Sequence, residues 1–139
     1  MIVLDTNVVS EPMKPGGDPV VQAWLDRQVA ETLYLTATSL SELLRGIEIL
    51  PDGRRKGGLG DALNELLLML FGSRILPFDR KAATAYAPLV GRARSAGRPI
   101  SVADGRIAAV ATVHGFRVAT RDVAPFAAAG VPVVNPWKE

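Results

Sequence analysis

The sequence predicts an α/β fold, a three-layer α/β/α sandwich around a central five-stranded, mainly parallel sheet. Short apolar runs rich in β-branched residues alternate along the chain with longer segments of helical periodicity, which is typical of a parallel sheet covered by helices. At 139 residues, of which 48% are hydrophobic, the chain has the size and composition of one compact domain. We expect residues 1–139 to form that single domain.

Five segments are predicted as strands, because each is short, apolar and followed by residues that favour turns or helix starts. They are Ile2–Leu4, Leu33–Thr36, Ile75–Pro77, Arg117–Thr120 and Val131–Val134. The carboxyl ends of parallel strands meet at one edge of a sheet, where open α/β folds build their sites. We therefore look for functional side chains directly after these segments.

The first helix is predicted from a cap signal. Asp18 supplies a side chain for the N-cap, and Pro19 fits the first helical position. The apolar spacing that follows predicts a helix that buries Trp24 and Val29.

Two further helices are expected before the third strand. One covers residues 39 to about 50, and the other covers residues 59–71 and ends at Gly72. Residues 51–60 are rich in glycine and charge, which predicts a flexible loop between these helices.

The second half of the chain predicts two long helices. Asp79 is suited to cap an alanine-rich helix that ends before Gly97. Ser101 begins another helix, which reaches His114 and counts Val102 among its apolar positions.

Composition excludes several classes of function. The chain has no cysteine, so disulfides and thiolate metal sites are absent, and no run of about 20 apolar residues could span a membrane. We expect a cytoplasmic protein with no membrane partner. A net charge of +2 with a pI near 9.3, from arginines that occur in clusters, weakly favours a polyanionic partner.

Four acidic residues stand where a site would form, although each also has a simple structural explanation. Asp5 directly follows the first strand and Asp122 follows the fourth, and either side chain could cap the turn or helix after it. Glu42 and Asp104 each lie three residues after a serine, which is the pattern of a helix capping box.

The coincidence of the four acids points to a metal. Carboxylates that converge on one edge of a sheet repel each other unless they are protonated or neutralised by a cation. Oxygen ligands without cysteine or a nearby histidine favour Mg²⁺ or Mn²⁺ over Zn²⁺. The only histidine, His114, is expected at the opposite end of its helix from Asp104.

The strings around these acids resemble the PIN-domain family. In chain order they are Leu4-Asp5-Thr6-Asn7, Ser41-Glu42-Leu43, Ala103-Asp104-Gly105-Arg106-Ile107-Ala108-Ala109 and Thr120-Arg121-Asp122. The resemblance covers nearly the whole chain and is strongest to the VapC-type toxins of type II toxin–antitoxin modules, particularly the FitB-like branch. It implies a PIN-like nuclease domain, endoribonuclease activity on RNA, a Mg²⁺ or Mn²⁺ cofactor, a cognate antitoxin that links the toxin indirectly to DNA, and a homodimer.

The resemblance also assigns roles to single residues. The family's acidic positions, catalytic and metal-binding, fall on Asp5, Glu42, Asp104 and Asp122. Supporting positions fall on Asn7 and Thr120. Apart from the resemblance, we expect arginines near the acidic edge to hold RNA. The candidates are Arg106 and Arg121, which lie close in sequence to Asp104 and Asp122.

Two neighbouring residues receive no such role. Asp79 also follows a strand, but the family pattern gives it no metal, so we interpret it as a helix cap. Gly105 occupies a position where such proteins often carry alanine, and we expect this departure to cost a little helix stability.

We expect hydrolysis that leaves 5′-phosphate and 3′-hydroxyl ends, because water and not the 2′-hydroxyl is the nucleophile. The alternative is a partner-binding module of a DNA-bound antitoxin repressor complex with little or no nuclease activity. Receiver domains and haloacid-dehalogenase-type phosphatases fit less well. The last strand leads to Asn135-Pro136 instead of a lysine, and Asn7 stands where the phosphatases need an aspartate.

Overall fold

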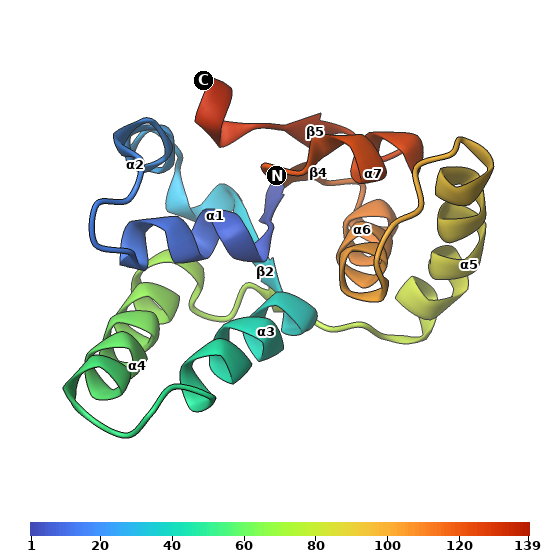
Figure 1. The fold of residues 1–139 in the computed structure, drawn as a ribbon. Helices are drawn as coiled ribbons and strands as arrows, with labels where there is room; N and C mark the ends of the chain where they lie inside the picture. The colour runs from blue at the N-terminus through green and yellow to red at the C-terminus, as the bar shows by residue number, and fades with distance from the viewer.

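The structure is a computed structural model that describes residues 1–139, and a five-stranded parallel sheet runs through its centre (Figure 1). The strands are β1 (Ile2–Leu4), β2 (Leu33–Thr36), β3 (Ile75–Leu76), β4 (Arg117–Ala119) and β5 (Val133–Val134). Every neighbouring pair is parallel. The predicted fold class and all of its strands are confirmed, and the last three strands are one or two residues shorter than expected.

The strand order β3-β2-β1-β4-β5 makes β1 the point where the chain changes direction across the sheet. From β1 the chain builds outward to β2 and β3, then crosses over to add β4 and β5 on the other side. Leu4 pairs with Ala119, so the carboxyl ends of β1 and β4 lie side by side. Such a switch point leaves a crevice at the strand ends, and in open α/β folds this crevice is the usual ligand site.

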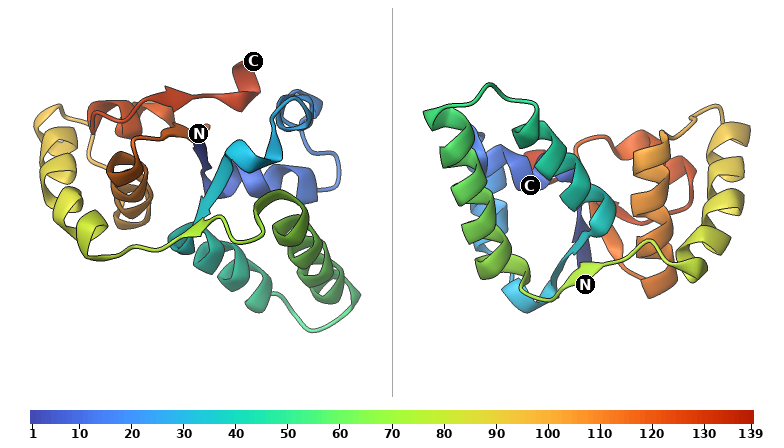
Figure 2. Two further views of the ribbon diagram at one scale, coloured as in Figure 1. Left: turned by 180° about the vertical axis from the view of Figure 1, so that it is seen from behind. Right: turned by 90° about the horizontal axis from the view of Figure 1, so that it is seen from below.

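Helices cover both faces of the sheet (Figures 1 and 2). One face carries α1 (Thr6–Ser10), α2 (Pro19–Asp26), α3 (Ala37–Glu48) and α4 (Arg54–Leu66), and the other carries α5 (Arg80–Ser95), α6 (Val102–His114) and α7 (Val123–Ala128). Short 3-10 turns cover Glu11–Met13, Ala30–Thr32 and Pro136–Lys138. The alternation of side chains along a strand separates the two cores, since Leu4 packs into the first and Val3 into the second.

The helix predicted after Asp18 is confirmed at its start and wrong at its end. The Asp18 carboxylate accepts a hydrogen bond from the Val20 N–H at 2.9 Å, and Pro19 takes the first helical position. The helix ends at Asp26, so Val29 lies outside it and is 62% exposed instead of buried. Val102, which the sequence analysis counts among the apolar positions of its helix, is 59% exposed, because it is the first helical residue of α6.

The glycine-rich segment 51–60 is mostly helical, which corrects the predicted loop. α4 begins at Arg54 and continues into a π-helix over Leu67–Phe71, and Gly72 ends it with a φ of +53°. A glycine inside a helix costs about 1 kcal/mol relative to alanine. Core packing offsets that cost here, since Leu63 of α4 is only 1% exposed and belongs to the core on that face of the sheet.

The two long helices of the second half are confirmed. The Asp79 carboxylate caps α5 by accepting from the Ala82 N–H at 3.0 Å, and Gly97 follows the helix with a φ of +71°. Gly115, with a φ of +70°, ends α6 after His114. None of the helices is long and apolar enough to cross a membrane.

Candidate functional site

Asp5 is the most buried member of the acidic set. It follows β1 directly, and only 4% of its surface is exposed. One carboxylate oxygen accepts from the Thr6 N–H at 2.7 Å, which caps α1, and the other accepts from the Thr120 hydroxyl at 2.8 Å. Both oxygens are therefore oriented by residues at the ends of neighbouring strands.

Thr120 links the β1 and β4 ends of the site. Its side chain is fully buried, and besides donating to Asp5 its hydroxyl accepts from the Asp122 N–H at 3.0 Å. This pair of hydrogen bonds fixes the backbone that carries Asp122 relative to Asp5. The supporting role of Thr120 stays a prediction.

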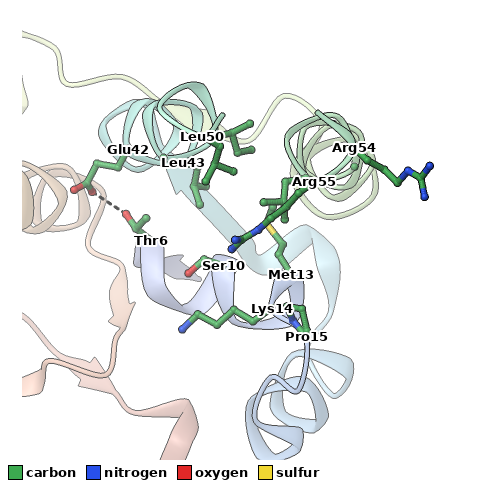
Figure 3. A pocket seen from close by; sticks show the side chains of 14 residues that line it. Thr6, Ser10, Met13, Lys14, Pro15, Glu42, Leu43, Leu50, Arg54 and Arg55 are labelled. Carbon is green, nitrogen blue, oxygen red and sulfur yellow. Dashed lines mark hydrogen bonds between the residues drawn. The ribbon is translucent and has the colours of Figure 1, made fainter. Parts of the chain in front are cut away.

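Glu42 reaches the site by a route that the sequence analysis did not anticipate. Ser39 does not cap α3, because β2 runs directly into the helix and the Thr36 hydroxyl accepts from the Ser39 N–H at 3.0 Å. Glu42 consequently lies in the second turn of α3, and not in the first. There its carboxylate accepts from the Thr6 hydroxyl at 2.8 Å, so the side chain points toward the start of α1 (Figure 3).

Asp104 lies where the cap signal placed it. Ser101 caps α6, and its hydroxyl oxygen accepts from the Asp104 N–H at 3.1 Å. Asp104 is thus in the first turn of α6, where the partial positive charge of a helix N-terminus stabilises a carboxylate modestly.

Asp122 precedes α7 without capping it. It occupies the N-cap position, but its side chain makes no capping hydrogen bond. The predicted cap is therefore wrong as an explanation of this residue. The carboxylate of Asp122 remains free for another role.

The electrostatics connect all four acids. Burial raises the pKa of Asp5 to about 6; the Thr120 hydrogen bond opposes this, and the charges of Asp104 and Glu42 add to it. Burial also raises the pKa of Asp104, its hydrogen bond with Ser101 opposes the rise, and the charges of Asp122 and Glu42 add to it. Asp5, Glu42 and Asp104 therefore repel one another near the strand ends, and Asp122 adds its charge through Asp104.

The donor set fits a hard divalent cation. None of the four carboxylates forms an ion pair with a lysine, an arginine or the histidine, so the chain itself leaves their charge uncompensated. His114, the only histidine, ends α6 and lies a helix length from Asp104. Oxygen ligands of this kind suit Mg²⁺ or Mn²⁺. As placed, however, no three His, Asp or Glu side chains of the chain lie together in a way that could hold a metal ion.

Two polar atoms of the helices beside the cluster have no partner. The side-chain oxygens of Asn7, on α1, and Ser39, on α3, are buried and accept or donate no hydrogen bond. Buried polar atoms without partners are rare and are often associated with function or bound water. The supporting role of Asn7 stays a prediction. The capping role predicted for Ser39 is wrong, because Thr36 caps α3.

The two arginines proposed to hold RNA are exposed and already in contact with aromatic rings. Arg106 lies over the Phe78 ring at 5.4 Å, and Arg121 lies over the Trp137 ring at 5.1 Å. Neither forms an ion pair. Their role toward RNA stays a prediction.

A groove beside the cluster escaped the sequence analysis. It has a volume of about 550 Å³ and lies between α1, α3 and α4, with Thr6 and Glu42 among the residues that line it. Its basic members are Lys14, Arg54 and Arg55 (Figure 3). The sequence analysis placed Arg54 and Arg55 in the loop predicted for residues 51–60, and it gave Lys14 no role.

The chain is similar to known proteins along almost its whole length. The PIN domain family pattern matches residues 2–131. The VapC ribonuclease Y4jK of Sinorhizobium fredii is 48% identical over 138 residues, covering 99% of each chain, and toxin FitB of Neisseria gonorrhoeae is 46% identical over 139 residues, covering 100% of each. The crystal structure of FitAcB from Neisseria gonorrhoeae matches with a TM-score of 0.94 at 46% identity over 100% of both chains. FitAB bound to an IR36 DNA fragment gives 0.93 at 45% identity over 99% of this chain and 96% of that one.

Proposed function

Since the chain belongs to the PIN-domain family and to its VapC and FitB toxin members, we propose that it is a metal-dependent ribonuclease that acts as the toxin of a toxin–antitoxin pair. One observation carries the proposal: acidic side chains without any cationic partner in the chain approach each other near the switch point of the sheet, where the charges of Asp104 and Glu42 raise the pKa of Asp5, and the charges of Asp122 and Glu42 raise that of Asp104. Structural acids are normally paired or hydrogen-bonded to lower their pKa, whereas functional acids are often perturbed upward.

The residues that would hold Mg²⁺ or Mn²⁺ are Asp5, Glu42, Asp104 and Asp122. When bound, such an ion neutralises charge at the phosphate and lowers the pKa of a water molecule. Asp5 is the member whose position is best defined, because Thr6 and Thr120 hold one oxygen each. Thr120 would position Asp5 through the hydrogen bond from its hydroxyl, and Asn7 keeps the supporting role that the resemblance gives it.

The acids also set the proton balance of the site. In the free protein the pKa of Asp5, about 6, favours partial protonation of this residue near pH 6 and below, and the pKa of Asp104 is raised as well. A cation that binds there displaces those protons, so its affinity rises with pH. Cleavage of RNA is accordingly expected to increase from pH 5 to pH 7.

The direct test is end-group analysis of RNA after incubation with the purified protein and Mn²⁺. The native chain should produce 5′-phosphate and 3′-hydroxyl ends, and Asp5→Asn should produce none. Asp79→Asn serves as the matched control, because Asp79 follows a strand but only caps α5. Ends with 2′,3′-cyclic phosphate, or equal cleavage by the Asp5→Asn variant, would contradict the proposal.

The partner of such a toxin would be a cognate antitoxin, and through it operator DNA. The relatives solved as FitAB with an IR36 DNA fragment and as FitAcB support this part of the proposal. A toxin homodimer also belongs to the proposal, together with a cytoplasmic location. If binding were the only role, the native protein would leave RNA intact with Mn²⁺ while still forming an antitoxin complex on DNA.

A further inference from the structure

The groove between α1, α3 and α4 lies beside the carboxylate cluster, and the proposed chemistry leaves it unused. It shares Thr6 and Glu42 with the cluster, so a ligand in the groove ends beside the acids. Its volume of about 550 Å³ lies within the usual range for ligand sites. Met13, Leu43 and Leu59 contribute apolar surface to it.

The charges around the groove are mostly positive. Lys14, Arg54 and Arg55 line it, and Glu42 is its only acidic member. Lys14 is already paired with Glu11 at 3.1 Å, whereas neither arginine forms an ion pair or a side-chain hydrogen bond in the structure. The groove therefore has unused cationic charge.

The two arginines differ in direction. Arg55 extends from α4 across the groove toward Ser10 and Met13, and Arg54 extends away from it (Figure 3). Both belong to the first turn of α4, which contains no acidic residue and has no side-chain cap at Gly53. Cations there are unfavourable for the helix itself, because they lie at the positive end of its dipole. An anionic ligand would relieve that conflict at Arg55.

We propose that the groove holds the single-stranded RNA chain next to the cleaved bond, with the Arg55 guanidinium bound to a backbone phosphate and the bases against its apolar floor. This inference rests on the proposed ribonuclease function and names the path of its substrate. A guanidinium binds phosphate through two parallel hydrogen bonds, and single-stranded RNA exposes bases that can pack on side chains. Arg55 thereby replaces Arg106 and Arg121, whose guanidinium groups lie over aromatic rings, as the main contact for the backbone.

The test compares two adjacent charge removals. Fluorescein-labelled single-stranded RNA of random sequence is titrated in the Asp5→Asn background, so that cleavage does not consume the probe. Arg55→Gln should weaken binding about tenfold and lower the slope of log affinity against log salt by about 0.7, the value for one phosphate contact on a single strand. Arg54→Gln, with the same loss of net charge, should change the affinity less than about twofold by the same principle.

A second probe separates RNA from an acidic protein segment, which would meet the same side chains. Fluorescein-labelled poly-L-glutamate is titrated against the same variants. A loss confined to poly-L-glutamate overturns the proposal, and so does an equal loss of RNA affinity in Arg54→Gln and Arg55→Gln. Native protein that fails to cut RNA, but binds it through Arg55, would contradict the nuclease function and leave the groove assignment intact.

Discussion

Two segments of the chain share the pattern serine, two residues, acid, yet they occupy different places in their helices. Ser101 caps α6 and puts Asp104 in the first turn, whereas Ser39 lies inside α3 and puts Glu42 in the second. A loop precedes α6, but β2 runs straight into α3, so Thr36 takes the cap. A local motif predicts that a helix starts nearby, and the end of the preceding strand decides at which residue.

The two acids nevertheless act on the same partner. The charges of Asp104 and Glu42 both raise the pKa of Asp5, although one acid comes from each face of the sheet. Two acids can therefore act on the same carboxylate although they lie in different turns of their helices. Substitutions can separate the two properties.

The largest expected effect is on cleavage. Asp104→Asn and Glu42→Gln should each lower the rate of RNA hydrolysis at least about 100-fold, because each removes a metal-binding oxygen charge. Initial rates on labelled RNA with Mn²⁺ measure this. If only Asp104→Asn lost activity, Glu42 would not belong to the metal-binding carboxylates. The two serine-to-acid motifs would then differ in function as well as in their position in the helix.

The next effect is the pH dependence of stability, which Asp5 controls. Its pKa rises from 3.8 to about 6 on folding, so the folded state holds this proton more tightly than the unfolded state does. The stabilisation from the protonated form is complete below about pH 3.8 and is lost as the pH rises through 6, amounting to up to about 3 kcal/mol.

Asp5→Asn should therefore raise the free energy of unfolding of the metal-free protein at pH 7, although it abolishes cleavage. Urea unfolding in EDTA at pH 5 and pH 7 measures the difference between variant and native chains. The gain should shrink at pH 5. A variant that is less stable than the native chain at pH 7 would show that the carboxylate is a structural acid.

A smaller effect distinguishes the glycines of the same two helices. A Cβ on Gly105 would lie 2.8 Å from the Tyr86 ring, whereas a Cβ on Gly46 would meet nothing within 4 Å. Gly105→Ala should destabilise by about 1–3 kcal/mol through overpacking, and Gly46→Ala should stabilise by about 0.5–1 kcal/mol. Thermal unfolding of the two variants tests this. The sequence predicted only that Gly105 costs some helix stability. It could not show that the Tyr86 ring leaves no room for a side chain at this position.

The smallest effects concern the caps themselves. Thr36→Val and Ser101→Ala should each cost about 1 kcal/mol of stability, since each removes a capping oxygen. Ser39→Ala should be neutral or slightly stabilising, because its buried hydroxyl has no partner. Denaturant midpoints of the three variants, measured under the same conditions, rank these effects. If Ser39→Ala destabilised the protein as much as Ser101→Ala, Ser39 would be the capping residue of α3 after all.

The sequence predicted the sheet well, because strands depend on short-range signals. Strand ends are marked by apolar runs that stop at a polar residue, as at Asp5, and parallel strands necessarily bring those ends together. The failures have another origin. Val29 and the start of α4 depended on tertiary packing that periodicity does not contain, and glycine-rich composition at residues 51–60 concealed a helix.

The site was predictable in its charges and not in its contacts. Nothing in the spacing of Thr6 and Glu42, which lie 36 residues apart, indicates that their side chains meet. The groove was invisible for the same reason, since Arg55 and Thr6 belong to helices whose packing follows from the whole fold. The direction in which an arginine extends is a property of the folded chain alone.

Calorimetric titration of the native protein with Mn²⁺ at pH 6, in two buffers of different ionisation enthalpy, tests the central claim most directly. The carboxylate cluster should bind Mn²⁺ with release of protons, because Asp5 and Asp104 carry raised pKa values. Binding should be lost in Asp5→Asn and retained in Asp79→Asn. Absence of Mn²⁺ binding by the native chain, or equal binding by the Asp5→Asn variant, would contradict the account.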